Sequence, residues 1–161
     1  VKKSTEGNSK FPGYQQGALI PVLTGEGATW GPYYAQQGTW SRVGQTVLFS
    51  MYVAAENTNT LDVLLEIVGL PYAVSDSASS VFYSITVGYI SKLNTPDLFT
   101  AYLDPLTASS RIILVKPGLN GAARQSLNCS IFNDPDSRIM LSGHYITDDT
   151  TWTPQNGATV S

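Results

Sequence analysis

The feature that most constrains this fold is the regular alternation of side chains from Thr46 to Ala54, directly after a turn at Gly44. Large apolar side chains recur there at every second position, namely at Val47, Phe49, Met51 and Val53. A period of two over this length is typical of a strand with one buried face. The same period recurs at 61–68 and 81–89, and no segment has a clear helical apolar period. The chain is therefore predicted to be all-β.

About ten short strands are predicted, separated by stretches rich in Gly, Pro, Asn and Asp. They cover 18–23, 30–36, 38–43, 46–54, 61–68, 79–90, 99–103, 111–116, 127–132 and 138–146. Many short strands at close spacing are typical of a sandwich or barrel. Residues 17–161 are expected to form a single β-sandwich domain. Residues 1–16 lack apolar periodicity and are expected to be a linker or extended arm from an upstream segment.

Composition argues against several classes of partner. Nine Lys and Arg stand against twelve Asp and Glu, a formal net charge of −3, and charged residues make up only 13% of the chain. No basic stripe is available to follow a phosphate backbone, so nucleic acid is not an expected partner. No apolar run approaches the roughly 18 residues of a spanning helix, so membrane insertion is not expected. The polar, weakly charged composition suits neutral, hydrogen-bonding ligands.

Residues able to support catalysis or metal binding are few. One histidine, His144, is predicted to point to solvent or to a subunit interface, and Cys129 is predicted to be a buried free thiol. One His and one Cys cannot supply the usual four ligands of a zinc site, and no cofactor is expected. The oxygen-rich turn at Asp134 and Asp136 leaves two alternatives open. It holds a hard cation such as calcium, or its side chains cap their own backbone.

Aromatic residues outside the core alternation suggest carbohydrate recognition, because flat rings stack on apolar sugar faces while polar groups bond sugar hydroxyls. The candidate binding residues are Trp30, Tyr33, Tyr34, Tyr72, Phe99, Tyr102, Asp97 and Asp104. The alternative is that these rings close the ends of the sandwich. A third class, a glycan-cleaving enzyme using Asp97, Asp104 or Asp134, depends on the separation of paired carboxylates.

Several strands carry apolar side chains on both faces. Leu48 and Tyr52 oppose the Phe49 face, and Leu64 opposes the Leu65 face. In a sheet with one solvent-exposed face, apolar and polar side chains alternate more strictly along each strand. Leu48, Tyr52 and Leu64 are therefore expected to contact another copy of the chain.

Four short motifs, in this order, resemble those of C-terminal domains of bacteriophage tail fibres and tailspikes. They are an aromatic-x-Arg-x-Gly-x-x-Val hairpin at 40–47, a Gly-Leu-Pro-Tyr corner at 69–72, a Gly-Tyr-Ile strand at 88–90, and a Leu-Ser-Gly-His-Tyr closing strand at 141–145. The resemblance spans residue 17 to about residue 147. It implies a jelly-roll-type β-sandwich that assembles as a homotrimer in the virion tail, distal to an upstream shaft of the same fibre.

The resemblance also implies a role. Such domains are non-enzymatic, and they trimerise, bind host cell-surface polysaccharide, or do both. The alternative within this class is a trimerisation or intramolecular chaperone module without a ligand. In these relatives the first strand often carries an aromatic residue before its proline, but residues 17–21 of this chain do not. A segment that looks like this missing opening, with Trp152 before Pro154, stands near the end instead. The tail therefore either begins a further module or covers the core.

Overall fold

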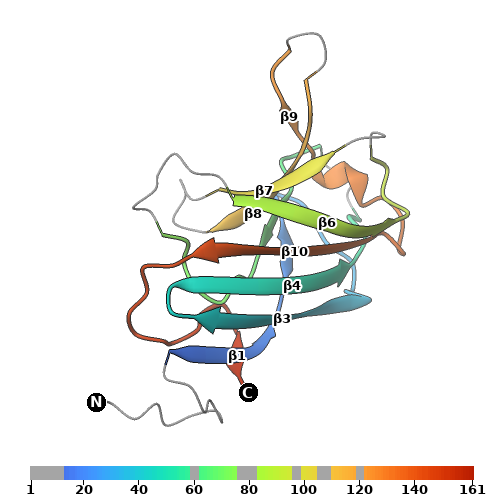
Figure 1. Cartoon of the computed structure of the whole chain (residues 1–161). Helices are drawn as coiled ribbons and strands as arrows, with labels where there is room; N and C mark the ends of the chain where they lie inside the picture. Colours follow the sequence, from blue (N-terminus) through green and yellow to red (C-terminus); the bar gives the residue numbers. More distant parts are fainter. Residues whose placement is uncertain (1–12, 59–61, 76–82, 96–98, 105–109, 119–121) are drawn as a thin grey trace.

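The computed structural model describes residues 13–58, 62–75, 83–95, 99–104, 110–118 and 122–161 (Figure 1). All of the strand pairs in this part of the chain are antiparallel, and it contains no α-helix, which confirms the all-β prediction. The strands are β1 (Tyr14–Leu19), β2 (Val22–Thr24), β3 (Ala35–Val43), β4 (Thr46–Ala54), β5 (Glu66–Val68), β6 (Tyr83–Ser91), β7 (Thr100–Asp104), β8 (Arg111–Lys116), β9 (Gln125–Ser126), β10 (Arg138–Ile146) and β11 (Thr159–Val160). A short 3-10 helix, η1, spans Cys129–Ile131.

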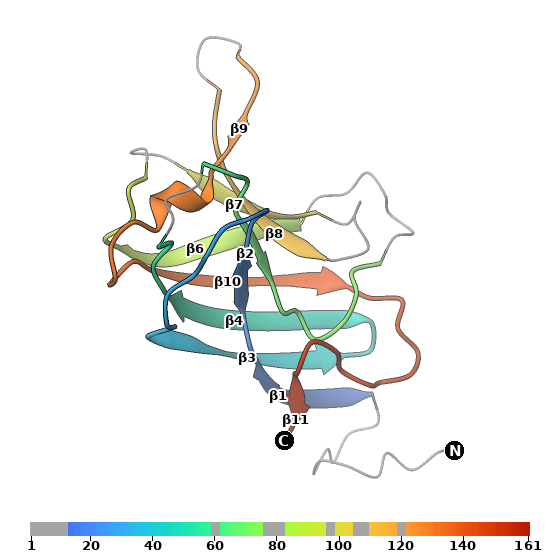
Figure 2. The ribbon, with the colours of Figure 1, turned by 180° about the vertical axis from the view of Figure 1, so that it is seen from behind.

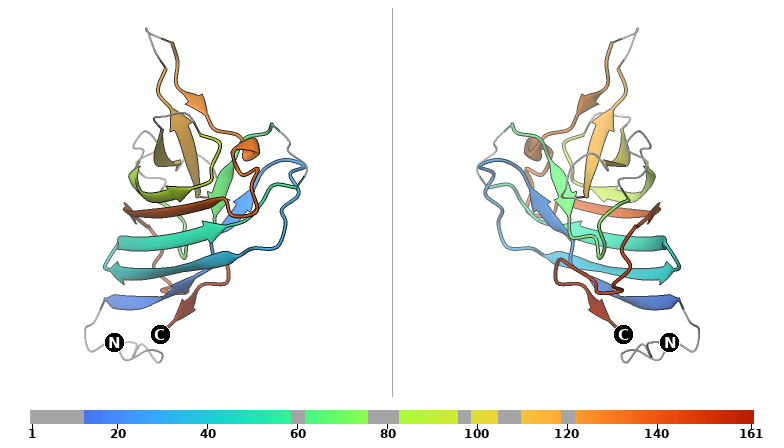
Figure 3. Two further views of the ribbon diagram at one scale, coloured as in Figure 1. Left: turned by 90° about the vertical axis from the view of Figure 1, so that its right-hand side faces the viewer. Right: turned by 90° about the vertical axis from the view of Figure 1, so that its left-hand side faces the viewer.

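The strands form one strongly curled sheet of eleven strands. Its order is β11-β1-β3-β4-β10-β6-β7-β8-β5-β2, with β9 beside β8. β1, β3, β4 and β10 lie in successive rows (Figure 1), and β2 and β5 cross in front of these rows when the molecule is seen from behind (Figure 2). The side views show the two halves of the sheet facing each other (Figure 3). The layering therefore comes from one sheet that curls over itself.

The β3–β4 hairpin follows from the motif at its turn. Val43 pairs with Thr46, so only Gly44 and Gln45 remain in the loop, and Gly44 has a φ of +57°. Two-residue hairpin loops need a positive φ, which glycine adopts without a steric penalty. This turn fixes the register in which β4 buries one face, as predicted from its alternation.

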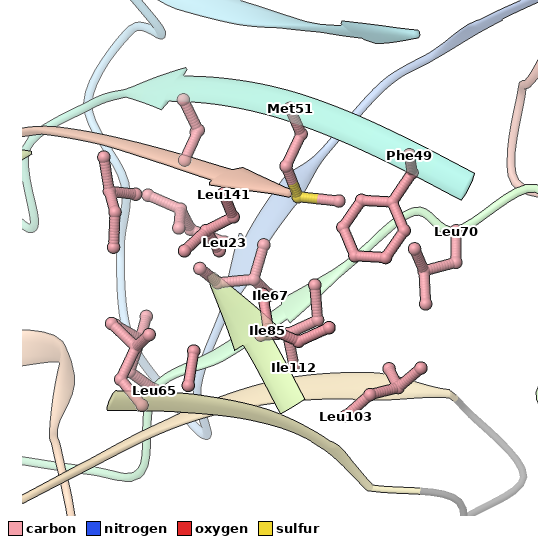
Figure 4. Close-up of a cluster of buried hydrophobic side chains, with 14 of the residues drawn as sticks. Leu23, Phe49, Met51, Leu65, Ile67, Leu70, Ile85, Leu103, Ile112 and Leu141 are labelled. Atoms are coloured by element: carbon pink, nitrogen blue, oxygen red, sulfur yellow. The ribbon is translucent and has the colours of Figure 1, made fainter. Parts of the chain in front are cut away.

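The core lies inside the curl. Phe49, Met51 and Leu141 point from β4 and β10 toward Ile67 of β5 and Ile112 of β8, from the opposite half (Figure 4). All five side chains are 5% exposed or less. Burial on this scale contributes roughly 1.5 to 3 kcal/mol for each large side chain, which stabilises the curled form.

Several predicted strands differ from the observed ones. The first is interrupted at Pro21, where β1 has ended and β2 has not begun, because proline has no N–H for a sheet ladder. The segment 30–36 is mostly irregular: Trp30 forms an isolated bridge to Asn57, and β3 begins only at Ala35. Residues 127–132 contain the 3-10 helix rather than a strand. β1 begins at Tyr14, inside the predicted arm, and residues 1–12 lie outside the described part.

The arginine of the hairpin motif, Arg42, is buried at one end of the core with only 1% of its surface exposed. Its guanidinium lies 4.4 Å from the centre of the Tyr72 ring and 4.0 Å from that of Trp152. Its Nη1 donates to Asp149 Oδ1 at 2.9 Å, its Nη2 donates to the Asp149 carbonyl, and its Nε donates to the Gly44 carbonyl at 2.8 Å. A buried cation of this kind needs both a counter-charge and hydrogen bonds, and it has both.

The carboxyl group of Asp149 responds to the same contacts. Burial alone would raise its pKa, but hydrogen bonds from Arg42, Thr151 and the Trp152 backbone, together with the charge of Arg42, outweigh burial and lower the pKa. The carboxylate thus stays ionised beside Arg42.

The C-terminal tail covers the core, as one of the two sequence interpretations expected. Trp152 packs on Arg42, and the Gln155 and Ser161 amides donate to the carbonyls of Pro71 and Gln16. β11 then pairs with β1, and Val160 packs against the buried cluster. The tail is therefore an integral part of the curled sheet.

Candidate ligand-binding site

An open hollow of about 500 Å³ lies over β7 and β8, and two of its lining residues, Ala101 and Phe99, also pack in or against the core. It is lined by Ser84, Phe99, Thr100, Ala101, Tyr102, Val115, Lys116, Pro117 and Arg124. Most of this lining is apolar or aromatic, with a few polar and cationic groups at its edges. That composition is typical of small-ligand sites.

Strand alternation explains how the hollow forms. Ala101 and Leu103 of β7 are buried in the core, so Tyr102 between them faces outward. Tyr102 pairs with Ser84 of β6 on one side, and Thr100 pairs with Val115 of β8. The Tyr102 ring therefore stands over the middle of three adjacent strands.

Two cations complete the rim. Lys116 ends β8 opposite Gln125 of β9, and Arg124 directly precedes β9. The Arg124 guanidinium lies 4.6 Å from the centre of the Tyr102 ring, a cation–π arrangement.

The structure brings two of the predicted binding residues together, Phe99 and Tyr102, which both line the hollow. Asp97 lies outside the described residues. Asp104 shares the outward face of β7 with Tyr102, but it is only 7% exposed and lies 3.7 Å from an Arg111 nitrogen. Arg111 also contacts Glu66, so Asp104 belongs to a charge cluster beside the hollow rather than to its lining.

The three aromatic residues near Gly31 lie in a different region. Trp30 packs edge-on against Phe132 with ring centres 5.8 Å apart. The Tyr33 hydroxyl accepts from the Leu23 amide at 3.0 Å, and burial raises the Tyr33 pKa in spite of that backbone contact. Tyr34 is the exposed member, at 61%. Trp30 and Tyr33 thus pack on the domain, as the alternative interpretation expected, and Tyr34 faces solvent.

Tyr72 is not placed to stack on a ligand, which corrects its assignment as a binding residue. It is 1% exposed and packs edge-on against Trp40 with ring centres 5.4 Å apart. Its backbone amide and carbonyl both bond the Tyr145 hydroxyl. The corner at Pro71 turns this ring inward, so Tyr72 contributes to the core.

The Asp134 and Asp136 turn is filled by basic side chains of the same chain. Lys92 Nζ lies 3.6 Å from Asp134 Oδ1 and 3.0 Å from Asp136 Oδ2, and Arg138 bonds Asp136 at 2.8 Å. Hydrogen bonds from Arg138 and Lys92 lower the Asp136 pKa. Asp134 also accepts the Asp136 amide, which is the self-capping alternative. Within the described ranges, no cluster of three or more His, Cys, Asp or Glu side chains is arranged to hold a metal ion.

The predicted contact residues divide between two places. Leu48 and Tyr52 share the outward face of β4, where Leu48 is 46% exposed. Leu64 instead bridges Asn128 and lines a second hollow of about 360 Å³ with Glu26 and Glu66. It therefore does not share a surface with Leu48 and Tyr52.

Two further residues extend the β4 surface. Met140 of β10 lies between Tyr52 of β4 and Tyr89 of β6 in the sheet, at 40% exposure for Met140 and 48% for Tyr89. We call Leu48, Tyr52, Tyr89 and Met140 the apolar patch. His144 is exposed beside Leu48, as expected. Cys129 is a buried free thiol, also as expected, and burial raises its pKa to about 11.

Sequence reasoning missed Lys116 and Arg124 at the hollow and Met140 and Tyr89 in the patch. Met140 carried a signal, because it alternates with Ile139 and Leu141 in a predicted strand. Tyr89 carried none, because its sequence period matches that of the buried Ile85 and the irregularity of the β6–β10 pairing lies beside it. Lys116 and Arg124 carried none, since the β8–β9 pairing places them together. No helix in the described part of the chain is long and apolar enough to cross a membrane.

These observations define an all-β protein with one curled antiparallel sheet and an open hollow lined by aromatic side chains over β7 and β8. No family model and no curated protein matches the chain. Among solved structures, the crystal structure of the Dettilon tailspike protein matches part of the fold with a TM-score of 0.62 and 18% sequence identity. The match covers 83% of this chain and 24% of the tailspike chain. At this identity the likeness establishes a shared fold.

Proposed function

We propose that this chain is a non-enzymatic, carbohydrate-binding domain of a bacteriophage tailspike or tail fibre, acting at the virion tail. The fold likeness to part of a tailspike supports the tail-associated role. The hairpin, corner and closing-strand motifs support a distal, C-terminal module of jelly-roll type that follows a shaft. Host cell-surface polysaccharide is the proposed ligand.

The observation that carries carbohydrate binding is the pairing of Phe99 and Tyr102 in one open hollow. Two rings on an apolar floor offer faces on which a sugar ring stacks, and Ser84 and Thr100 at the hollow offer hydroxyl partners. An open groove, rather than a closed cavity, admits one unit of a longer chain.

The test is binding of the labelled 161-residue chain to an array of bacterial surface polysaccharides. We expect retention on at least one glycan, and about fivefold to tenfold weaker binding for Tyr102→Ala and for Phe99→Ala, since a stacked ring contributes about 1 kcal/mol. Tyr34→Ala is the matched control, because Tyr34 is exposed outside the hollow. Absence of binding to every glycan would contradict the proposal. Release of reducing ends from a bound glycan would favour the glycan-cleaving alternative.

Assembly is a second function, and the apolar patch favours it. Leu48, Tyr89 and Met140 are each 40% exposed or more on three adjacent strands. Clustered exposed apolar side chains mark interaction surfaces. We propose that the patch contacts another copy of the chain in a homotrimer. A trimerisation or chaperone module without a ligand would use the patch and not the hollow.

A further inference from the structure

We propose that Asn156 in the C-terminal tail is a self-modification site that reacts when the tail opens. Its side-chain amide is then lost as ammonia, and the acid that remains prevents the tail from docking again. Asn156 precedes Gly157, and both residues are exposed. They lie between Trp152, which packs on the buried Arg42, and β11, which pairs with β1. The proposal is independent of the ligand-binding and assembly proposals.

The Asn156–Gly157 pair forms a tight turn. The φ angles are +55° for Asn156 and +73° for Gly157. The Ala158 amide donates to the Gln155 carbonyl at 3.0 Å, which closes the turn. Positive φ at both central residues is the mark of a type I′ turn, and Asn followed by Gly is a preferred sequence for it. The geometry of the tail therefore accounts for this pair of residues.

The Asn156 side chain fastens the turn to the corner that contains Pro71. Its Nδ2 donates to the Leu70 carbonyl at 2.8 Å, and the neighbouring Gln155 amide donates to the Pro71 carbonyl at 2.7 Å. The nitrogen that would leave is thus engaged while the tail is docked. Exposed segments open locally before the core unfolds. The reaction therefore proceeds from the small population of chains in which the tail is released.

The reaction is an intramolecular displacement. The Gly157 backbone nitrogen loses its proton to hydroxide and attacks Cγ of Asn156. The Cγ–Nδ2 bond breaks, and the side-chain nitrogen leaves as ammonia after taking a proton from water. A glycine leaves the attacking nitrogen unhindered, because it has no side chain. The cyclic succinimide then takes up one water molecule and opens to aspartate or to isoaspartate, in which the backbone runs through the side chain.

The product no longer fits the contact with Leu70. A carboxylate accepts hydrogen bonds and donates none, so it would face the Leu70 carbonyl as a second acceptor, and the bond from position 156 is lost. Isoaspartate also lengthens the backbone of a two-residue turn, which moves β11 out of its register with β1. The modification therefore converts a reversible opening of the tail into a lasting one.

Peptide mapping by mass spectrometry tests the modification. Trypsin cleaves after Arg138, and the last peptide, 139–161, contains Asn156 as its one asparagine. At mildly alkaline pH we expect Asn156 to gain the mass of an amide-to-acid change at least about tenfold more slowly in the folded chain than in urea, because the tail must open first. Gly17→Ala, which crowds the β11–β1 pairing, should speed the change in the folded chain, and Gly88→Ala should not.

Hydrogen exchange tests the consequence. Asn156→Asp should accelerate exchange at the Gln155 and Ser161 amides by about tenfold, because one hydrogen bond is lost and two acceptors face each other. Asn133→Asp is the matched control, since it adds the same charge at an exposed position outside the tail, and both rates should stay unchanged. The proposal is overturned if Asn156 stays unmodified in urea, if it reacts equally fast in the folded chain, or if exchange in Asn156→Asp is unchanged.

Discussion

Arg42 shows how one residue joins distant parts of this molecule. It lies on β3, yet its guanidinium contacts Tyr72 from the Pro71 corner and Asp149 and Trp152 from the tail. An arginine is suited to this position because its planar group stacks on rings by its faces and donates hydrogen bonds at its edge. A neutral side chain of similar length would fill the space but would leave Asp149 without its counter-charge.

Replacing Arg42 should therefore destabilise the fold strongly. We expect Arg42→Met to lower the free energy of unfolding by about 3 kcal/mol, since removing one partner of a buried pair leaves the other uncompensated. Arg42→Lys should recover only part of this loss, because lysine lacks the planar fork. Urea unfolding followed by tryptophan fluorescence measures both.

Arg138→Met is the control for this prediction. Arg138 also pairs with an aspartate, Asp136, but its side chain is 38% exposed and that of Asp136 is 45% exposed. Exposed pairs contribute about 1 kcal/mol or less. Equal losses for Arg42→Met and Arg138→Met would contradict the structural role assigned to Arg42.

At the scale of elements, the pairing of β11 with β1 attaches the tail to the sheet. Gly17 of β1 lies opposite Val160, and the Ser161 amide donates to the Gln16 carbonyl at 3.0 Å. A Cβ atom on Gly17 would lie 1.6 Å from the Thr159 carbonyl oxygen, which is backbone and cannot rotate away. The close approach of these two strands therefore requires glycine at this position.

Gly17→Ala should displace β11 while the rest of the sheet remains folded. We expect faster hydrogen exchange at the Ser161 amide and a loss of about 1 to 3 kcal/mol of stability, in the range of overpacking. Gly88→Ala is the control, because the nearest atom to its Cβ position is 3.9 Å away. An unchanged Ser161 exchange rate in Gly17→Ala would show that the tail is not held by this pairing.

Sequence periodicity predicted the elements that have one buried face and missed those set by distant contacts. β4, β8 and β10 follow the predicted bounds, because each buries alternate or successive apolar side chains. β11 is two residues long and is held in the sheet by its pairing with β1. A strand this short has no local sequence pattern that would predict it. At the candidate site, the sequence alternation alone predicts that Tyr102, between Ala101 and Leu103, points away from the core. The inward turn of Tyr72 and the approach of Arg124 depend on tertiary packing.

At the scale of the whole molecule, the curled sheet separates two surfaces with different chemistry. The hollow over β7 and β8 is lined by Phe99 and Tyr102 together with Lys116 and Arg124, whereas the apolar patch over β4, β10 and β6 carries no charged side chain among its four members. A domain that both assembles and binds a ligand needs two such surfaces, so that one remains open when the other is covered.

Leu48→Asp should disrupt the proposed trimer. An aspartate there would place an unpaired charge in a dry contact, which is strongly unfavourable. We expect light scattering to report a trimer for the unmodified chain at micromolar concentration and a monomer for the variant, with unchanged circular dichroism. Tyr34→Asp, an exposed ring outside the patch, should remain trimeric. A monomeric unmodified chain would contradict the homotrimer proposal.

We propose that surface polysaccharide binds in the hollow of Phe99 and Tyr102. A crystal structure of the chain soaked with an oligosaccharide from the best-bound array glycan would locate the bound sugar. We expect a sugar ring stacked on Phe99 or Tyr102. A sugar bound elsewhere, such as over Tyr34, or none bound at all, would contradict this proposal.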